Sequence, residues 1–256
     1  MESYSYKGIH NLIDKVRRFY KFSPEEIRSL LIVILTLSFI VGFNDGRDTS
    51  SLVQWSWNFF VVAIIIAFSI LASESAKRIA AMIRGYKAEF RVWWYGLLFG
   101  IVVAILSNGY VWLLLPGGMY VSMLERHRLG KFRYGMNYYT VGGTAFAGPC
   151  MYIVIALLFK LIGGFSIFAG NPILHLVIAI NLVLAICTGL CIPPMDGTLL
   201  MFASRVAYGF WYILLLGAAL LIWLDLSLWV ILFGSLVIGI VGFAVAYSKE
   251  KYDITT

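Results

Sequence analysis

The chain has 256 residues, of which 61% are hydrophobic and only 13% are charged, and its mean hydropathy is +0.87. This composition excludes an ordinary water-soluble globular domain and predicts an integral membrane protein. The net charge of +7 is compatible with nucleic-acid binding. However, the Lys and Arg residues lie in short segments that flank apolar runs, which is the pattern that orients membrane helices, so we expect no nucleic-acid partner.

The predicted elements are mainly hydrophobic helices of membrane-spanning length. Several apolar runs reach the roughly 20 residues that a helix needs to cross a bilayer, and strand-like alternation is confined to one short region. We therefore expect an all-α, multi-pass protein of the cytoplasmic membrane, in contact with lipid, with a single membrane domain over residues 29–248. The polar and basic residues 1–28 predict a cytoplasmic, interfacial N-terminal segment, and residues 249–256 form a C-terminal tail.

Six full spans are expected. Ser23 is a typical N-cap followed by a proline and two glutamates, so the first helix begins there and its apolar part covers about residues 30–43. A second, longer run covers about residues 55–84, and Gly85 is placed to end it. The other four spans are expected at about 145–161, 172–190, 208–224 and 226–247.

The apolar run from Val92 to Pro116 has basic residues on both sides. If this run crossed the membrane once, the second basic cluster would lie outside, against the positive-inside tendency. We therefore expect a re-entrant segment, with the N-terminus, the polar stretch after the segment and the C-terminus all in the cytoplasm. That polar stretch alternates in polarity around a turn and predicts a short β-hairpin with strands near 118–122 and 138–141.

Charged residues near membrane depth form the candidate site. Asp196 follows Pro194 at the end of an apolar helix, and Glu74 and Lys77 lie about one turn apart on the inner half of the second span. A carboxylate in such a place is costly unless it faces the protein interior, a metal or a cation. Asp196 is therefore interpreted as a site residue, and the alternative is an aspartate in water at a helix end.

The three cysteines indicate neither a disulfide framework nor a metal centre. All of them fall in apolar segments, where cysteine usually packs as a small hydrophobic residue. Cys187 and Cys191 lie four apart on one helix face, as a soft-metal pair would, but no third thiol or nearby histidine accompanies them. The packing interpretation is therefore favoured.

These motifs resemble those of the site-2 protease family of intramembrane zinc metalloproteases, in particular its archaeal members. The motifs that carry the resemblance are a zinc-motif position at Ser73 to Lys77, the segment Gly85 to Phe90, the hairpin, Ala147-Gly148-Pro149, and Pro193-Pro194-Met195-Asp196-Gly197. The resemblance covers about Phe68 to Met201. It implies a site-2-protease-like helical bundle whose core spans about residues 55–201.

The zinc-binding pattern of that family is degenerate in this chain. The chemistry needs two histidines four apart to hold zinc, a glutamate between them as general base, and a distant aspartate as third ligand. The resemblance places Ser73, Glu74 and Lys77 at the His, Glu and His positions, and it retains Asp196. Because an ammonium is repelled by zinc and ligates only as a neutral amine, we expect no zinc, no other cofactor and no catalytic residue.

The leading hypothesis is a catalytically inactive homologue, a pseudoprotease that acts as a membrane scaffold and binds a transmembrane partner or client. The resemblance implies that the outer edge of the hairpin binds an extended segment, and it places Thr188 where the family has a substrate-holding asparagine. The expected binding residues are Gly118, Met119, Tyr120, Val121, Ser122 and Thr188.

Lys77 is expected to replace the metal by forming a structural salt bridge with Asp196, with Glu74, or with both. The alternative is a lysine that reaches to the membrane interface and contacts water. Two other functions stay open on the same residues. One is an active metalloprotease with a non-standard ligand set, such as Glu74, Asp196 and a thiol. The other is an ion- or proton-conducting protein that uses the three charges.

Overall fold

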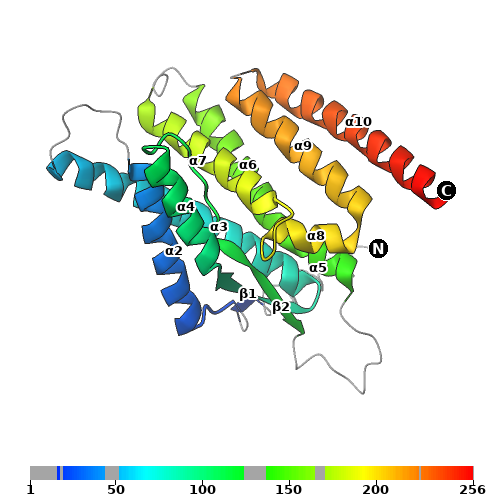
Figure 1. Cartoon of the computed structure of the whole chain (residues 1–256), viewed down its shortest axis with the longest axis horizontal. Coiled ribbons are helices and arrows are strands. Elements are labelled where there is room, and N and C mark those ends of the chain that lie inside the picture. The colour runs from blue at the N-terminus through cyan, green and yellow to red at the C-terminus, as the bar shows by residue number, and fades with distance from the viewer. Residues whose placement is uncertain are drawn as a thin grey trace.

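The protein is a bundle of helices with a small two-stranded sheet at one end (Figure 1). The computed structural model describes residues 16–17, 20–43, 52–123, 137–164, 171–224 and 226–255. Helices α2 and α4 lie on one flank and α9 and α10 on the other, with α6 and α7 between them (Figure 1). The elements in chain order are α2 (Pro24–Gly42), α3 (Leu52–Ile83), β1 (Tyr86–Val92), α4 (Trp94–Leu106), β2 (Gly117–Met123), α5 (Tyr138–Ala145), α6 (Ala147–Gly163), α7 (Pro172–Gly189), α8 (Asp196–Ala203), α9 (Arg205–Trp223) and α10 (Leu228–Thr255).

The start of α2 and the end of α3 are those that the sequence predicts. Ser23 caps α2, its hydroxyl accepts from the amide of Glu26, and the Glu26 carboxylate in turn accepts from the amide of Ser23. Helix α3 ends at Ile83, and Gly85 follows with a φ of 82°, a conformation that residues with a Cβ rarely adopt. At 32 residues α3 is longer than a bilayer requires, so its last turns extend to the sheet.

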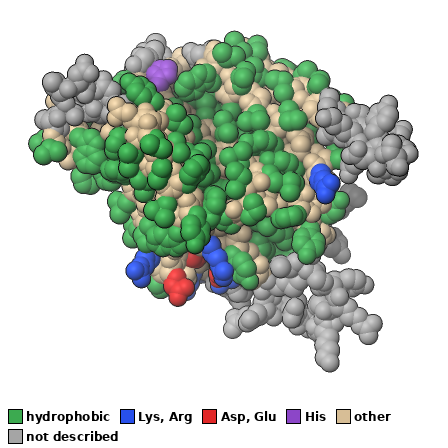
Figure 2. All heavy atoms as spheres, in the orientation of Figure 1, with side chains coloured by type: hydrophobic (Ala, Val, Ile, Leu, Met, Phe, Trp, Pro, Cys, Tyr) green, Lys and Arg blue, Asp and Glu red, His purple; other side chains and the backbone are tan. Residues whose placement is uncertain are grey.

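Six full spans are not confirmed. Within the described residues, four helical segments are long and apolar enough to cross a membrane: Leu52–Ile83, Tyr138–Gly163, Pro172–Gly189 and Arg205–Trp223. Helix α2 has 19 residues but carries several charges in its first turns, and the apolar part of α10 is shorter. On the face shown in Figure 2, hydrophobic side chains cover most of the surface and charged side chains gather mainly at the sheet end.

The segment between the two strands leaves the sheet and returns to the same place. Helix α4 has 13 residues, which is about 20 Å at the usual rise and short of a hydrocarbon core of about 30 Å. The chain turns at Ser107 to Gly109 and returns without regular structure to β2, where Gly117 pairs with Val92. The segment therefore begins and ends at the sheet, and its re-entry into the membrane stays a prediction.

The predicted hairpin has the wrong partner strand. Strand β2 is where it was expected, but it pairs antiparallel with β1, which lies on the other side of α4, with Tyr86 opposite Met123. Residues 138–141 are not a strand but the start of α5, because Asn137 caps that helix by accepting from the amide of Tyr139. The turn of the expected hairpin, residues 124–136, lies outside the described residues.

Candidate functional site at the inner end of α3

Helix α3 places three chemically distinct side chains in the protein interior. Ser73, Glu74 and Lys77 have relative exposures of 0%, 4% and 2%. Their spacing puts Ser73 and Lys77 one turn apart on the same face of the helix, with Glu74 beside them. This face packs against α6, where a Cβ added at Gly148 would meet the Ser73 hydroxyl at 2.9 Å and the Lys77 side chain at 3.0 Å. The glycine of the Ala-Gly-Pro motif thus lets the two helices approach closely at the site.

Asp196 reaches the same place from the other end of the chain. It is the first residue of the short helix α8, which the sequence reasoning missed, and it is only 1% exposed. Residues 190–195 connect α7 to α8, and Met195 is fully buried. The proline-rich end of α7 therefore turns the chain inward, so that the carboxylate points at α3 and not at water.

The three charged groups form one buried ion cluster. The Lys77 Nζ atom lies 2.9 Å from Oδ2 of Asp196 and 2.5 Å from Oε1 of Glu74. The other carboxylate oxygen of Asp196, Oδ1, accepts a hydrogen bond of 3.1 Å from the backbone amide of Met119. The cluster therefore joins α3, β2 and α8, three elements that are far apart in the sequence. The alternative interpretation, in which the Lys77 side chain reaches to the membrane interface and contacts water, is therefore wrong.

The charges in this cluster are unequal, because two carboxylates share one ammonium. Tyr152 of α6 is 2% exposed and lies beside the cluster and beside Ser73. The Ser73 hydroxyl is buried and makes no hydrogen bond of ordinary geometry within the described part of the chain. Desolvation of three ionisable groups is costly, so their mutual attraction and the Met119 amide are needed to hold them there.

Most of the expected binding residues are covered in this structure. A Cβ at Gly118 would overlap the carbonyl oxygen of Pro194, so the start of β2 lies directly against the α7–α8 connection. The side chains of Met119 and Val121 are buried, whereas Tyr120 is exposed and the Arg91 guanidinium lies over its ring at 4.0 Å. The structure therefore brings only Met119 of this strand to the ion cluster.

Thr188 does not join the cluster through its side chain. It is 2% exposed, and its hydroxyl donates to the carbonyl oxygen of Leu184 in the preceding turn of α7, at 2.6 Å. The hydroxyl is therefore satisfied within its own helix. Ser122 is half-buried near the end of β2, next to residues outside the described part.

The donor set at this position does not fit a zinc ion. The described residues contain no group of three His, Cys, Asp or Glu side chains placed to hold a metal. Both carboxylates that such an ion would use already contact the Lys77 ammonium, which has no free electron pair to offer a metal. Ser73 contributes only a neutral hydroxyl.

Sequence reasoning missed a second buried ion pair, which lies one residue further along α3. The Arg78 guanidinium pairs with Glu26 of α2, contacts the face of Phe22 at 3.9 Å and donates to the carbonyl of Lys21. Glu26 also accepts from the backbone amide of Phe90 in β1, at 2.9 Å. The spacing of Ser23 and Glu26 is that of a capping box, so the sequence indicates Glu26 as a capping residue. It gives no indication that Arg78 is its ion-pair partner.

The sequence is similar to that of a protein whose name describes a zinc metalloprotease. The chain is 28% identical over 184 residues to the protein of Methanocaldococcus jannaschii named "Putative zinc metalloprotease MJ0611", and the match covers 70% of this chain and 84% of the relative. No family model matches the chain, and no solved structure gives a significant match. Together with four helices of spanning length, this similarity supports an integral membrane protein of a zinc-metalloprotease-like family.

Proposed function

We propose that the protein is a pseudoprotease: a membrane protein with the architecture of a zinc metalloprotease in which a lysine ammonium takes the place of the metal. In this proposal the chain binds no zinc, cleaves no peptide bond, and acts by holding a transmembrane partner or client. The observation that carries the proposal is the position of Lys77, whose Nζ lies between Glu74 and Asp196 at 2.5 and 2.9 Å.

The chemistry of the cluster supports this proposal. Metal-assisted hydrolysis needs a cation that polarises a carbonyl and an open position for water. An ammonium supplies positive charge but no coordination site, and here its hydrogens are directed to carboxylates. Glu74, which the resemblance places at the general-base position, forms a salt bridge with Lys77 and is only 4% exposed. The cluster thus fits a structural role, because it fastens α8 and β2 to α3.

Metal content and cleavage test the proposal directly. The full chain, purified without chelator and reconstituted in nanodiscs, is expected to contain far less than one zinc per protein by elemental mass spectrometry. It is also expected to leave a generic transmembrane substrate uncut. Stoichiometric zinc that is lost on Asp196→Ala, or chelator-sensitive cleavage, would contradict the proposal.

The double variant Ser73→His/Lys77→His provides the matched positive control. Two histidines one turn apart together with Asp196 restore a three-ligand zinc set. We expect this variant to bind about one zinc, since the three positions lie around a common point in the fold. The single variants Ser73→His and Lys77→His are expected to bind much less tightly, because each leaves the set incomplete.

A further inference from the structure

The outer edge of β1, and not that of β2, faces an accessible pocket. In an antiparallel pair, alternate residues direct their backbone groups to the partner strand or away from it. The Phe90 amide donates to Glu26 of α2, so Phe90, and by the same alternation Val92, direct their backbone groups away from β2. The corresponding edge of β2 is covered at Gly118 and Met119 by the α7–α8 connection and Asp196.

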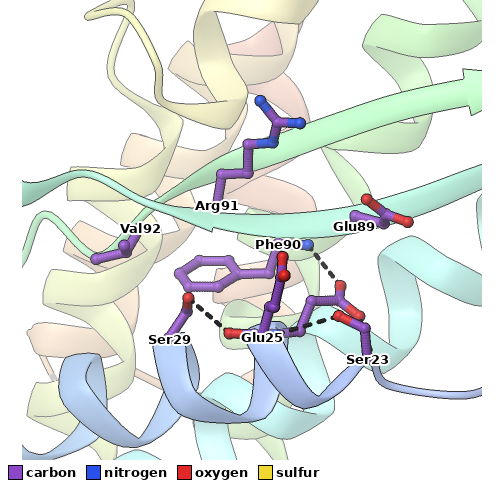
Figure 3. Close-up of a pocket in the computed structure, with 8 residues that line it drawn as sticks. Ser23, Glu25, Ser29, Glu89, Phe90, Arg91 and Val92 are labelled. Atoms are coloured by element: carbon purple, nitrogen blue, oxygen red, sulfur yellow. Dashed lines mark hydrogen bonds between the residues drawn. The ribbon is translucent and has the colours of Figure 1, made fainter.

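A pocket of about 260 Å³ lies between this edge and the first turns of α2 (Figure 3). Its wall on the helix side is formed by Ser23, Glu25, Glu26 and Ser29, and its wall on the strand side by residues 89–92. The volume lies just below the usual range of about 300 to 1,000 Å³ for small-molecule sites. It is therefore suited to one long side chain that belongs to a larger partner.

The charges of the lining favour a cationic side chain. Three carboxylates line the pocket, against a single cation, Arg91. Arg91 leaves the strand on the side opposite Phe90, and its guanidinium lies over the Tyr120 ring (Figure 3). Glu26 is paired with Arg78, and Glu89 is paired with Lys87 at 2.5 Å.

Glu25 is exposed and has no salt-bridge partner among the described residues. Its side chain rises from α2 toward the strand beside Phe90 (Figure 3). It is thus the carboxylate left to pair with a partner's charge. The partly exposed apolar side chain of Val92 can contact the methylene stem of a Lys or Arg side chain.

We propose that this edge pocket binds an extended segment of a membrane partner through one Lys or Arg side chain. The charge of that side chain pairs with Glu25, and the backbone of the segment bonds to the outward groups of Val92, since the Phe90 amide already donates to Glu26. Lys and Arg are enriched in the short cytoplasmic flanks of transmembrane spans, so a membrane partner offers such a segment if the sheet end lies in the cytoplasm, as the basic clusters of the sequence predict. This inference rests on the proposed partner-binding function and gives its site and the chemistry of its ligand.

A double-mutant cycle between Glu25 and the ligand lysine tests the charge pairing. The probe is a labelled ten-residue peptide of alternating Val and Thr with one central Lys, compared with the same peptide carrying norleucine, which keeps the stem and removes the charge. Binding to the full chain in nanodiscs is measured by fluorescence anisotropy. The Lys peptide is expected to bind about fivefold more tightly than the norleucine peptide, as an ion pair at a partly exposed site allows.

In Glu25→Gln, the two peptides are expected to bind equally. In the control Arg28→Gln, an exposed change on the same helix that does not line the pocket, the fivefold difference is expected to persist. A difference that persists in Glu25→Gln, or its absence in the unmodified protein, would overturn the proposed site.

Two further measurements identify the edge and the occupant. Val92→Pro removes one outward amide without removing a bond between β1 and β2, so it is expected to weaken the Lys peptide several-fold. A photo-crosslinker placed at Ser29 is expected to label the peptide. Labelling of the chain's own N-terminal segment, of a second copy or of lipid in its place would overturn the assignment of the occupant.

The pseudoprotease proposal and the edge-pocket proposal can be tested independently. Zinc content and cleavage decide whether the chain is a protease, and they do not depend on the edge pocket. A zinc-containing, cleaving protein that keeps the Glu25-dependent cycle would remove the pseudoprotease and retain the binding site.

Discussion

Two buried ion clusters lie side by side on α3, and they are built differently. Arg78 pairs with one carboxylate, Glu26, whose oxygens also accept from two backbone amides, and its guanidinium contacts an aromatic face. Lys77 is shared between two carboxylates and makes no cation–π contact among those observed in the described residues. The Arg78 cluster is balanced in charge and joins α2, α3 and β1, as a structural ion pair does.

The Lys77 cluster is the unbalanced one, and it lies where the sequence resemblance places a zinc site. A divalent cation between two carboxylates and neutral ligands would leave no excess negative charge, whereas a single ammonium does. Under the pseudoprotease proposal, the excess negative charge of the Lys77 cluster is what remains of a former metal site. The Arg78 cluster, which is balanced in charge, is an ordinary stabilising ion pair. Four sets of variants test this difference.

The largest effect is expected from Lys77→Ala. This change leaves Glu74 and Asp196 buried without a cation, which is expected to destabilise the protein by about 3 to 5 kcal/mol. The measurement is the midpoint of denaturant unfolding in a fixed detergent. The double variant Lys77→Ala/Asp196→Ala is expected to recover about 1 to 2 kcal/mol, because it removes one stranded carboxylate. If the single and double variants unfold at the same midpoint, the three groups are not coupled.

A smaller effect is expected from Glu26→Gln. The amide keeps the shape of the side chain and one acceptor oxygen, but it removes the charge that pairs with Arg78. We expect a loss of about 2 kcal/mol, the usual contribution of a hydrogen bond to a charged group. Arg78→Ala in the same background is then expected to cost less than it does alone. Equal costs in the two backgrounds would show that Arg78 is held by Phe22 and Lys21 rather than by Glu26.

Arg78→Lys is expected to cost about 1 to 2 kcal/mol, because lysine keeps the charge but loses the fork of donors and the flat contact with Phe22. The exchange in the other direction, Lys77→Arg, adds bulk opposite Gly148, where the Lys77 chain already lies 3.0 Å from the point that a Cβ atom would occupy. We expect Lys77→Arg to be the more damaging of the two exchanges in thermal unfolding. The reverse order would mean that the Lys77 cluster is the looser one.

The smallest effect is expected from Ser73→Ala. The hydroxyl lies beside Tyr152 but makes no hydrogen bond of ordinary geometry among the described residues, so its removal is expected to change the unfolding free energy by less than about 0.5 kcal/mol. The matched control is Ser38→Ala in α2, an equally buried serine whose hydroxyl donates to the Ile34 carbonyl at 2.6 Å, where a loss of about 1 kcal/mol is expected. A large loss at Ser73 would indicate that its hydroxyl serves the ion cluster or its neighbour Tyr152.

The membrane class, the boundaries of most helices and the contact between Lys77 and the carboxylates can be predicted from the sequence. They follow from local rules: apolar length, capping residues, helical spacing, and the cost of an isolated buried charge. Ser23 and Gly85 act at the ends of their helices through neighbours a few residues away, so no distant information is needed to place them.

The pairing of β1 with β2 and the closure of the β2 edge by Asp196 depend on the packed fold. Strand pairing across α4 joins residues about 30 positions apart, and the register depends on the whole path between them. The Glu26–Arg78 pair and the pocket at Glu25 likewise need α2, α3 and β1 in place together. Local sequence does not encode such contacts, because their free energy exists only once the elements have packed.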